Sequence, residues 1–157
     1  MARDPAKPRR RIPWLVLNVA ACLIWLAVPR IQRSISAESC IANLTQITGA
    51  TMIYSMDHDD RLPPASTWAD ATLPYTIGRT AYACPDIDGS QADQFGHAFS
   101  TALSLRAIKS VADPSSQVLF FDSSDLRWNA NGDPAKAVSG GRWNVATLDG
   151  NFRRGLP

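Results

Sequence analysis

The hydrophobic pattern begins with a continuous apolar run. Ile12 to Val28 reads IPWLVLNVAACLIWLAV and contains no formal charge. As a helix this run would span about 25 Å, slightly less than a hydrocarbon core. Trp14 and Trp25 stand near its ends, and five basic residues precede it, so the positive-inside rule places residues 1–11 in the cytoplasm. We therefore predict a transmembrane helix over 12–28 that follows a basic cytoplasmic tip over 1–11.

A buried helix of a soluble protein is the less favoured alternative for this run. Two processing routes also stay open. Ser36-Ala37 before Glu38 could be a signal-peptidase site, and 19–22 resembles a lipobox that would place a lipid on Cys22. An uncleaved anchor fits better, because the apolar run continues past Cys22 and Arg30 separates it from the Ser36-Ala37 site.

After Pro29 the pattern becomes that of an amphipathic helix. Ile41, Leu44, Ile47, Thr51 and Tyr54 recur at spacings of three and four, which predicts a helix over about 35–57. It should end near Asp57, because the acidic and proline-containing sequence that follows continues a helix poorly.

The C-terminal half predicts strands. Residues 117–121 form a compact apolar run typical of a buried strand, and 144–148 predict a second strand. Asp149-Gly150 is a tight-turn dipeptide that would return the chain as a hairpin through 151–154. We also expect a short helix over 98–109. The fold class predicted is α+β: a long N-terminal helix, half in the membrane and half amphipathic, packed on a small antiparallel-sheet head over 29–157.

Composition and charge distribution argue against nucleic-acid binding. The chain has 157 residues, 45% of them hydrophobic, and 16 Lys and Arg residues against 14 Asp and Glu residues. The basic residues concentrate at the N-terminal tip, so the body is slightly acidic. Because nucleic-acid binding needs a basic face on the folded part, we expect no nucleic acid partner.

A set of residues in fixed order resembles a known family. It begins with a Cys, two residues, Asn-Leu, one residue and Gln-Ile, and it ends with Asp-Gly near the C-terminus. The matching positions include Cys40, Asn43, Leu44, Gln46, Ile47, Cys84, Pro85, Asp122, Asn144, Asp149 and Gly150. This set resembles bacterial prepilin-like proteins, which are relatives of the type II secretion pseudopilins.

The resemblance implies a pilin-like fold and a structural role, and the chain departs from the family twice. The family's C-terminal signature is a His, nine residues and Asp-Gly, and here Ser139 stands at the His position. The prepilin cleavage motif, Gly-Phe-Thr-Leu-Ile-Glu in type, is absent before the apolar run, where residues 7–14 read KPRRRIPW. The missing Glu makes peptidase processing and filament assembly the weakest parts of the comparison.

Two cysteines fall outside the predicted membrane segment. Cys40 and Cys84 lie on the side where disulfides persist, and their bond would stabilise the head by roughly 3–4 kcal/mol. Two free thiols are the alternative.

Calcium is the one metal that the sequence favours. Asp57, Asp59 and Asp60 form an acidic cluster of the kind that supplies oxygen ligands, with helix capping and a solvated turn as the favoured interpretation. Some type II pseudopilins use calcium, so the resemblance makes this ion possible; no cofactor is required. Trp128 and Trp143 could alternatively stack on sugars, with core packing as the simpler interpretation.

The predicted function is therefore non-enzymatic, since hydrolase, metalloprotease and phosphate-loop motifs are absent. We expect a single-pass protein of the bacterial cytoplasmic (inner) membrane, with its head periplasmic or extracellular. It would contact membrane lipid and act as a pseudopilin-like subunit beside other pilin-like or secretion-system subunits. The alternative is an anchored extracytoplasmic binding module for calcium, a glycan or a protein, without filament assembly.

Overall fold

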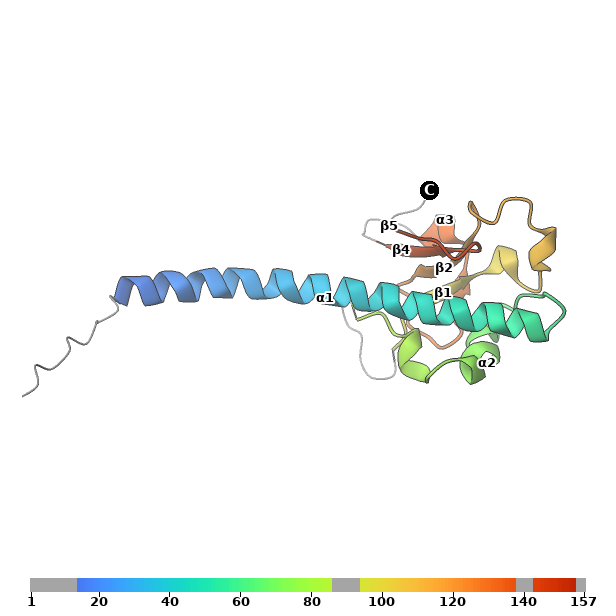
Figure 1. The fold of residues 1–157 in the computed structure, drawn as a ribbon, viewed down its shortest axis with the longest axis horizontal. Coiled ribbons are helices and arrows are strands. Elements are labelled where there is room, and N and C mark those ends of the chain that lie inside the picture. Colours follow the sequence, from blue (N-terminus) through green and yellow to red (C-terminus); the bar gives the residue numbers. More distant parts are fainter. Residues whose placement is uncertain (1–13, 86–93, 138–142, 155–157) are drawn as a thin grey trace, which may run out of the picture. The chain divides into compact units, whose positions relative to one another are not determined.

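The structure is a computed structural model that describes residues 14–85, 94–137 and 143–154. Helix α1 (Trp14–Asp57) contains Pro29. The chain divides into two compact units, Met1–Ser34 and Ile35–Pro157, with the division inside α1. The second unit holds all of the sheet (Figure 1).

A five-stranded sheet organises the second unit. Its strands are β1 (His97–Ser100), β2 (Val118–Asp122), β3 (Asn131–Gly132), β4 (Asn144–Thr147) and β5 (Phe152–Arg154), in the spatial order β3-β1-β2-β4-β5. Strands β1, β2, β4 and β5 pair antiparallel, whereas β3 pairs with β1 in parallel. The sheet is therefore mixed.

Short helices fill the long connections. They are α2 (Trp68–Thr72), η1 (Leu73–Tyr75), η2 (Arg79–Tyr82), η3 (Thr101–Leu103), η4 (Ile108–Ser110) and α3 (Pro134–Ala137). None of them is longer than five residues. Their packing in the second unit therefore depends on anchors in the core rather than on helix stability of their own.

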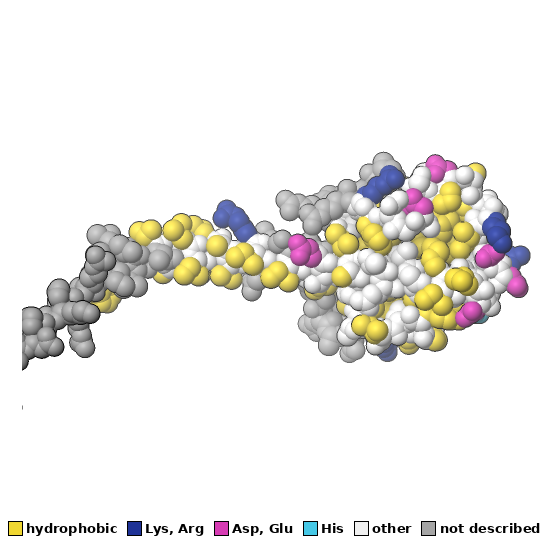
Figure 2. All heavy atoms as spheres, viewed as in Figure 1, with side chains coloured by type: hydrophobic (Ala, Val, Ile, Leu, Met, Phe, Trp, Pro, Cys, Tyr) yellow, Lys and Arg dark blue, Asp and Glu magenta, His cyan; other side chains and the backbone are white. Residues whose placement is uncertain are grey.

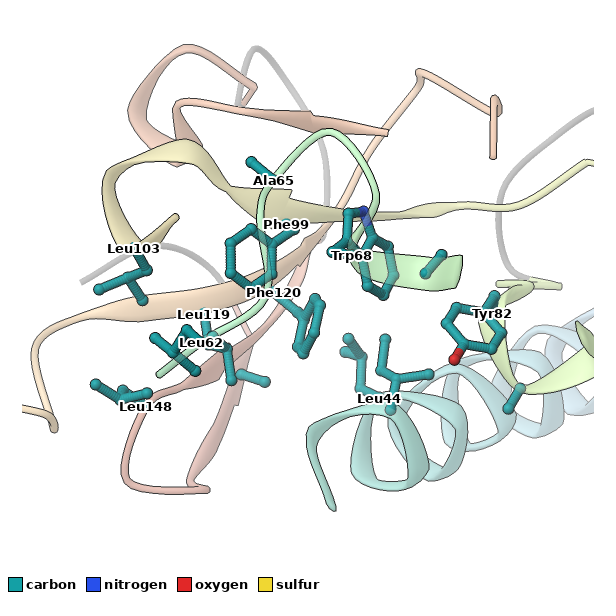
Figure 3. Packing of buried hydrophobic residues seen from close by; sticks show 14 of the residues in the cluster. Leu44, Leu62, Ala65, Trp68, Tyr82, Phe99, Leu103, Leu119, Phe120 and Leu148 are labelled. Carbon is teal, nitrogen blue, oxygen red and sulfur yellow. The ribbon is translucent and has the colours of Figure 1, made fainter. Parts of the chain in front are cut away.

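The Ile35–Asp57 part of α1 packs on one face of the sheet (Figure 1). Leu44 and Ile47 on this helix are fully buried, and they belong to the same cluster as Trp68 from α2 and Phe99 and Phe120 from the sheet (Figure 3). Full burial of side chains of this size contributes about 1.5–3 kcal/mol each. Leu44 and Ile47, which belong to the residues spaced three and four apart in the sequence, thus lie on the core face of this part of the helix.

Strand β2 shows how two adjacent apolar residues reach the same core. Its pairing with β4 shifts register between Val118 and Phe120. Leu119 and Phe120 consequently both join the main cluster, while Val118 and Phe121 join a second cluster on the opposite side. A bulge of this kind breaks the strict alternation of a strand.

The predicted fold class is wrong. It required a helix whose first half crosses a membrane, but within residues 14–85, 94–137 and 143–154 no helix is long and apolar enough for that. The sheet is also mixed rather than antiparallel, because β3 runs alongside β1.

Among the other local predictions, three strands are confirmed and one short helix is wrong. The strands predicted near 117–121, 144–148 and 151–154 are confirmed as β2, β4 and β5. The short helix predicted over 98–109 is wrong, because 97–100 form strand β1 and only two 3-10 turns follow it. The predicted tip over 1–11 lies outside the described residues, and the predicted domain limits at 12–28 and 29–157 stay predictions.

Candidate functional site

The most unusual chemistry in the head is a buried polar cluster on three neighbouring strands. His97 on β1 is paired in register with Asp122 on β2, and Asn144 begins β4 on the other side of β2. Their exposed fractions are 1%, 3% and 4%. Charged and ring-nitrogen groups are rarely buried to this extent unless they are paired.

Asp122 is the acceptor at the centre of the cluster. Its Oδ1 lies 3.1 Å from His97 Nδ1, and its Oδ2 accepts hydrogen bonds of 2.9 Å from the backbone N–H and from Nδ2 of Asn144. Because the carboxylate is acceptor-only, His97 donates from Nδ1 and carries its proton there. Both carboxylate oxygens are thus satisfied inside the protein.

The other ring nitrogen of His97 is not satisfied. Nε2 is buried and has no hydrogen-bond partner among the described residues. Leaving a buried polar atom without a partner costs about 1–3 kcal/mol, so such an atom calls for an explanation.

A disulfide lies beside this cluster. Cys40 on α1 is bonded to Cys84, which confirms the predicted pair, and both residues are fully buried. Asn43 on α1 donates hydrogen bonds from Nδ2 to the carbonyl oxygens of Ala83 (2.6 Å) and Thr80 (3.3 Å), two residues that precede Cys84 in the chain. The helix and the segment that carries Cys84 are therefore tied together by a covalent bond and by hydrogen bonds.

Cys84, His97 and Asp122 come close enough to act on one atom. One ligand-type atom from each of the three lies within 4.8 Å of the other two, and among the described residues no other group of three His, Cys, Asp or Glu does this. With Cys84 in a disulfide its sulfur is neither a thiolate nucleophile nor a thiolate ligand. The oxidised protein therefore holds the partners of a chemical site but keeps the sulfur blocked.

Two of the three predicted calcium residues have other partners. Asp57 Oδ2 accepts a hydrogen bond of 2.9 Å from the Tyr75 hydroxyl, and Asp60 forms an ion pair with Lys109. Asp59 and Asp60 both have positive φ, as residues in a tight turn after a helix often do. Among the described residues these three carboxylates are not one of the groups whose ligand atoms lie close together, and the calcium site stays a prediction. The Asp57 carboxylate raises the pKa of Tyr75 through their hydrogen bond.

The residues of the family-like set occupy varied places. Leu44 and Ile47 are core residues, Gln46 and Pro85 are exposed, and Ser139 lies outside the described residues. Cys40, Asn43, Cys84, Asp122 and Asn144 lie in or next to the buried cluster, and Asp149 and Gly150 lie in the turn between β4 and β5. Five positions of the set therefore lie near the junction between α1 and the sheet.

Asp149 and Gly150 close the hairpin between β4 and β5. Gly150 has φ 84° and donates its N–H to the Thr147 carbonyl, and the positive φ suits glycine. A hydrogen bond from the Thr147 hydroxyl, together with others from Asn151, lowers the pKa of Asp149. The turn predicted from this dipeptide is confirmed.

Trp128 offers no open stacking face of the kind a sugar site needs. The Arg79 guanidinium lies 4.4 Å from its ring centroid, and the rings of Tyr82 and Phe95 lie against it at 4.9 and 4.7 Å. Its Nε1 donates to Asp70 at 2.7 Å, and this hydrogen bond is the main reason why the pKa of Asp70 is lowered. Trp128 is a packing residue with a satisfied indole.

A separate feature is the exposed apolar surface of α1. Figure 2 shows exposed hydrophobic side chains along this helix. Those with large exposed fractions include Trp14 (82%), Leu23 (61%), Ile24 (62%) and Trp25 (79%). The others in this part of the helix are Val19, Leu26, Val28, Ile31 and Ile35. Large exposed apolar side chains gathered along one helix are typical of an interaction site.

His97 is a residue of this cluster that the sequence analysis did not single out. A sequence signal did exist: Asp122 directly ends an apolar strand, so its carboxylate had to be buried with a partner. The identity of that partner depends on strand pairing, which the sequence did not reveal.

Comparison with known proteins gives no match for this chain to a protein-family model, to a curated protein or to a solved structure.

Proposed function

We propose that this protein is a non-enzymatic, pilin-like structural or assembly subunit of a bacterial secretion or pilus-type system. The observation that carries the proposal is the exposed apolar surface of α1 over Trp14–Ile35. In an assembly this surface packs against the corresponding helix of other subunits, while the Ile35–Pro157 unit carries the folded head.

The energetics of that surface favour association. Each large apolar side chain that becomes fully buried contributes about 1.5–3 kcal/mol. Burial of four such side chains therefore contributes about 6–12 kcal/mol, comparable with the estimated 4–15 kcal/mol cost of bringing two proteins together. A helix that contacts several neighbours buries more of this surface than a helix that contacts one. The gain in buried apolar surface therefore favours a larger assembly over a single weak dimer.

Three further features support the proposal. Cys40, Asn43 and Cys84 of the family-like set lie where α1 joins the sheet, and they tie the helix to the head. The disulfide there supports an oxidising compartment, on the periplasmic or extracellular side, for the head. A blocked Cys84 sulfur beside His97 and Asp122 supports a structural rather than a catalytic role in the oxidised protein.

Cysteine cross-linking tests the proposal directly. The chain has three cysteines, two of them in the disulfide, so exposed Cys22 on α1 is the natural reporter. A short bismaleimide added to the full chain under non-reducing conditions is expected to give covalent dimers, because helices in contact bring two Cys22 side chains together.

Matched variants separate specific packing from chance collision. Cys22→Ser must abolish the dimer, and Cys22→Ser combined with Ile77→Cys moves the thiol to a head residue that is 87% exposed and should give little product. Ile24→Asp is expected to reduce Cys22 cross-linking at least tenfold, whereas Ile77→Asp leaves it unchanged. Equal cross-linking at positions 22 and 77, or none at 22, would contradict assembly through α1.

A further inference from the structure

The disulfide and the buried polar cluster together contain four residues that bind metals in other contexts. Cys84, His97 and Asp122 offer ligand atoms within 4.8 Å of one another, and Cys40 brings a second sulfur because it is bonded to Cys84. All four side chains are at least nine-tenths buried. They come from α1, from the segment after η2 and from two hydrogen-bonded strands, so the scaffold around them is extensive.

The state of His97 is the second, independent sign of a ligand site. Its Nδ1 donates to Asp122, which leaves Nε2 as the nitrogen with the free lone pair, and Nε2 is buried without a partner. A histidine that binds zinc through one ring nitrogen commonly donates a hydrogen bond from its other ring nitrogen to a carboxylate. The oxidised protein gives this lone pair nothing to bind.

We propose that Cys40, Cys84, His97 and Asp122 form a binding site for a divalent transition metal of the zinc type when the Cys40–Cys84 disulfide is reduced. Two thiolates and an imidazole are the ligands that zinc prefers, and Asp122 orients His97. Calcium does not fit, because it takes six to eight oxygen ligands. The inference concerns the head alone and does not depend on assembly through α1.

The two states exchange by a balanced reaction. A dithiol reductant transfers two electrons and two protons to the Sγ–Sγ bond of Cys40 and Cys84, which gives two thiols and leaves the reductant as a disulfide. The metal ion then displaces the two thiol protons and binds the thiolates. The same residues would therefore hold the α1–sheet junction by a covalent bond under oxidising conditions and by a metal ion under reducing ones.

Cys84, His97 and Asp122 are near enough to approach a shared ion. One ligand-type atom of each lies within 4.8 Å of the other two. With bonds of about 2.0–2.1 Å to nitrogen and about 2.3 Å to sulfur, ligand atoms of a tetrahedral site lie roughly 3.3–3.8 Å apart, so the side chains must move closer together once reduction has released the two sulfurs.

Metal titration of the full chain is the test. The protein, either oxidised or reduced with a phosphine under nitrogen, is titrated with Co²⁺ and followed by its thiolate-to-cobalt absorption, and then with Zn²⁺ as competitor. We expect one tightly bound ion per reduced chain and no such absorption from the oxidised chain. Absence of binding by the reduced chain would overturn the proposal.

The controls distinguish this site from any pair of thiols. Cys22→Ser and His58→Asn remove the third cysteine and the other histidine, and both should bind as the unaltered chain does. His97→Asn should weaken binding by about 10- to 100-fold or more, with loss of the nitrogen contribution to the cobalt spectrum. Equal affinity of His97→Asn and the unaltered chain would refute the assignment.

If reduction unfolds the head, binding of the metal ion should refold it. Because ion binding is coupled to folding, Zn²⁺ should restore the circular dichroism and the buried tryptophan fluorescence of the reduced chain. Zn²⁺ should not restore them in His97→Asn. A reduced chain that stays unfolded with Zn²⁺ would count against the site.

Discussion

Removal of the Cys40–Cys84 disulfide gives the most quantitative test of how the head is held together. The bond closes a sequence separation of 44 residues. In the chain-entropy treatment, a loop of this length raises the free energy of unfolding by about 4 kcal/mol at 25 °C. Because the two cysteines connect α1 to the segment before β1, we expect Cys40→Ala/Cys84→Ala to lose about this amount.

Urea unfolding followed by tryptophan fluorescence measures the loss, since Trp68 is almost fully buried in the core of the head. With a slope of about 2 kcal/mol per molar urea, a loss of 4 kcal/mol lowers the midpoint by about 2 M. The matched control is Cys22→Ala, at an exposed cysteine without a bond, which should change stability by less than about 0.5 kcal/mol. A midpoint change in the double variant no larger than that of the control would refute the reasoning.

The remaining predictions concern the core, the buried cluster and the hairpin turn. Trp68→Ala should cost about 3–5 kcal/mol in urea unfolding, because it empties the centre of the main cluster; a loss below 1 kcal/mol would contradict that packing. Asp122→Ala should cost about 2–4 kcal/mol by the same assay, since it leaves buried donors of His97 and Asn144 without an acceptor, and Asp122→Asn, which keeps one oxygen, should cost less. The lowered pKa of Asp149 stabilises the fold above its unfolded value of about 3.9, and this contribution is lost as the pH falls through the lower folded value. Asp149→Asn should therefore flatten the decrease in melting temperature between pH 5 and pH 2, and an unchanged pH profile would exclude the turn as a source of acid sensitivity.

Local features of the head were readable from the sequence wherever one segment determined its own structure. The apolar run that became β2 and the Asp149-Gly150 turn between β4 and β5 follow from side-chain type and turn chemistry within a few residues. The disulfide was also predictable, because only two cysteines lie outside the apolar run. Burial of Leu44 and Ile47 followed from helical spacing alone.

Strand β1 shows where local pattern fails. Its sequence, His97–Ser100, has no strand signal strong enough to exclude a helix, and it becomes a strand because β2 and β3 supply hydrogen-bond partners on both sides. The parallel pairing with β3 depends on the path of the intervening chain, which no short pattern encodes.

The sequence by itself thus determined the turn, the buried strands, the core face of α1 and the cysteine pair, since each depends on interactions between near neighbours or on a single possible partner. Only the tertiary structure decided that His97, Asp122 and Asn144 meet beside Cys84. The register between β1, β2 and β4 sets that meeting, and shifting a strand by one residue would turn each of these side chains to the opposite face of the sheet.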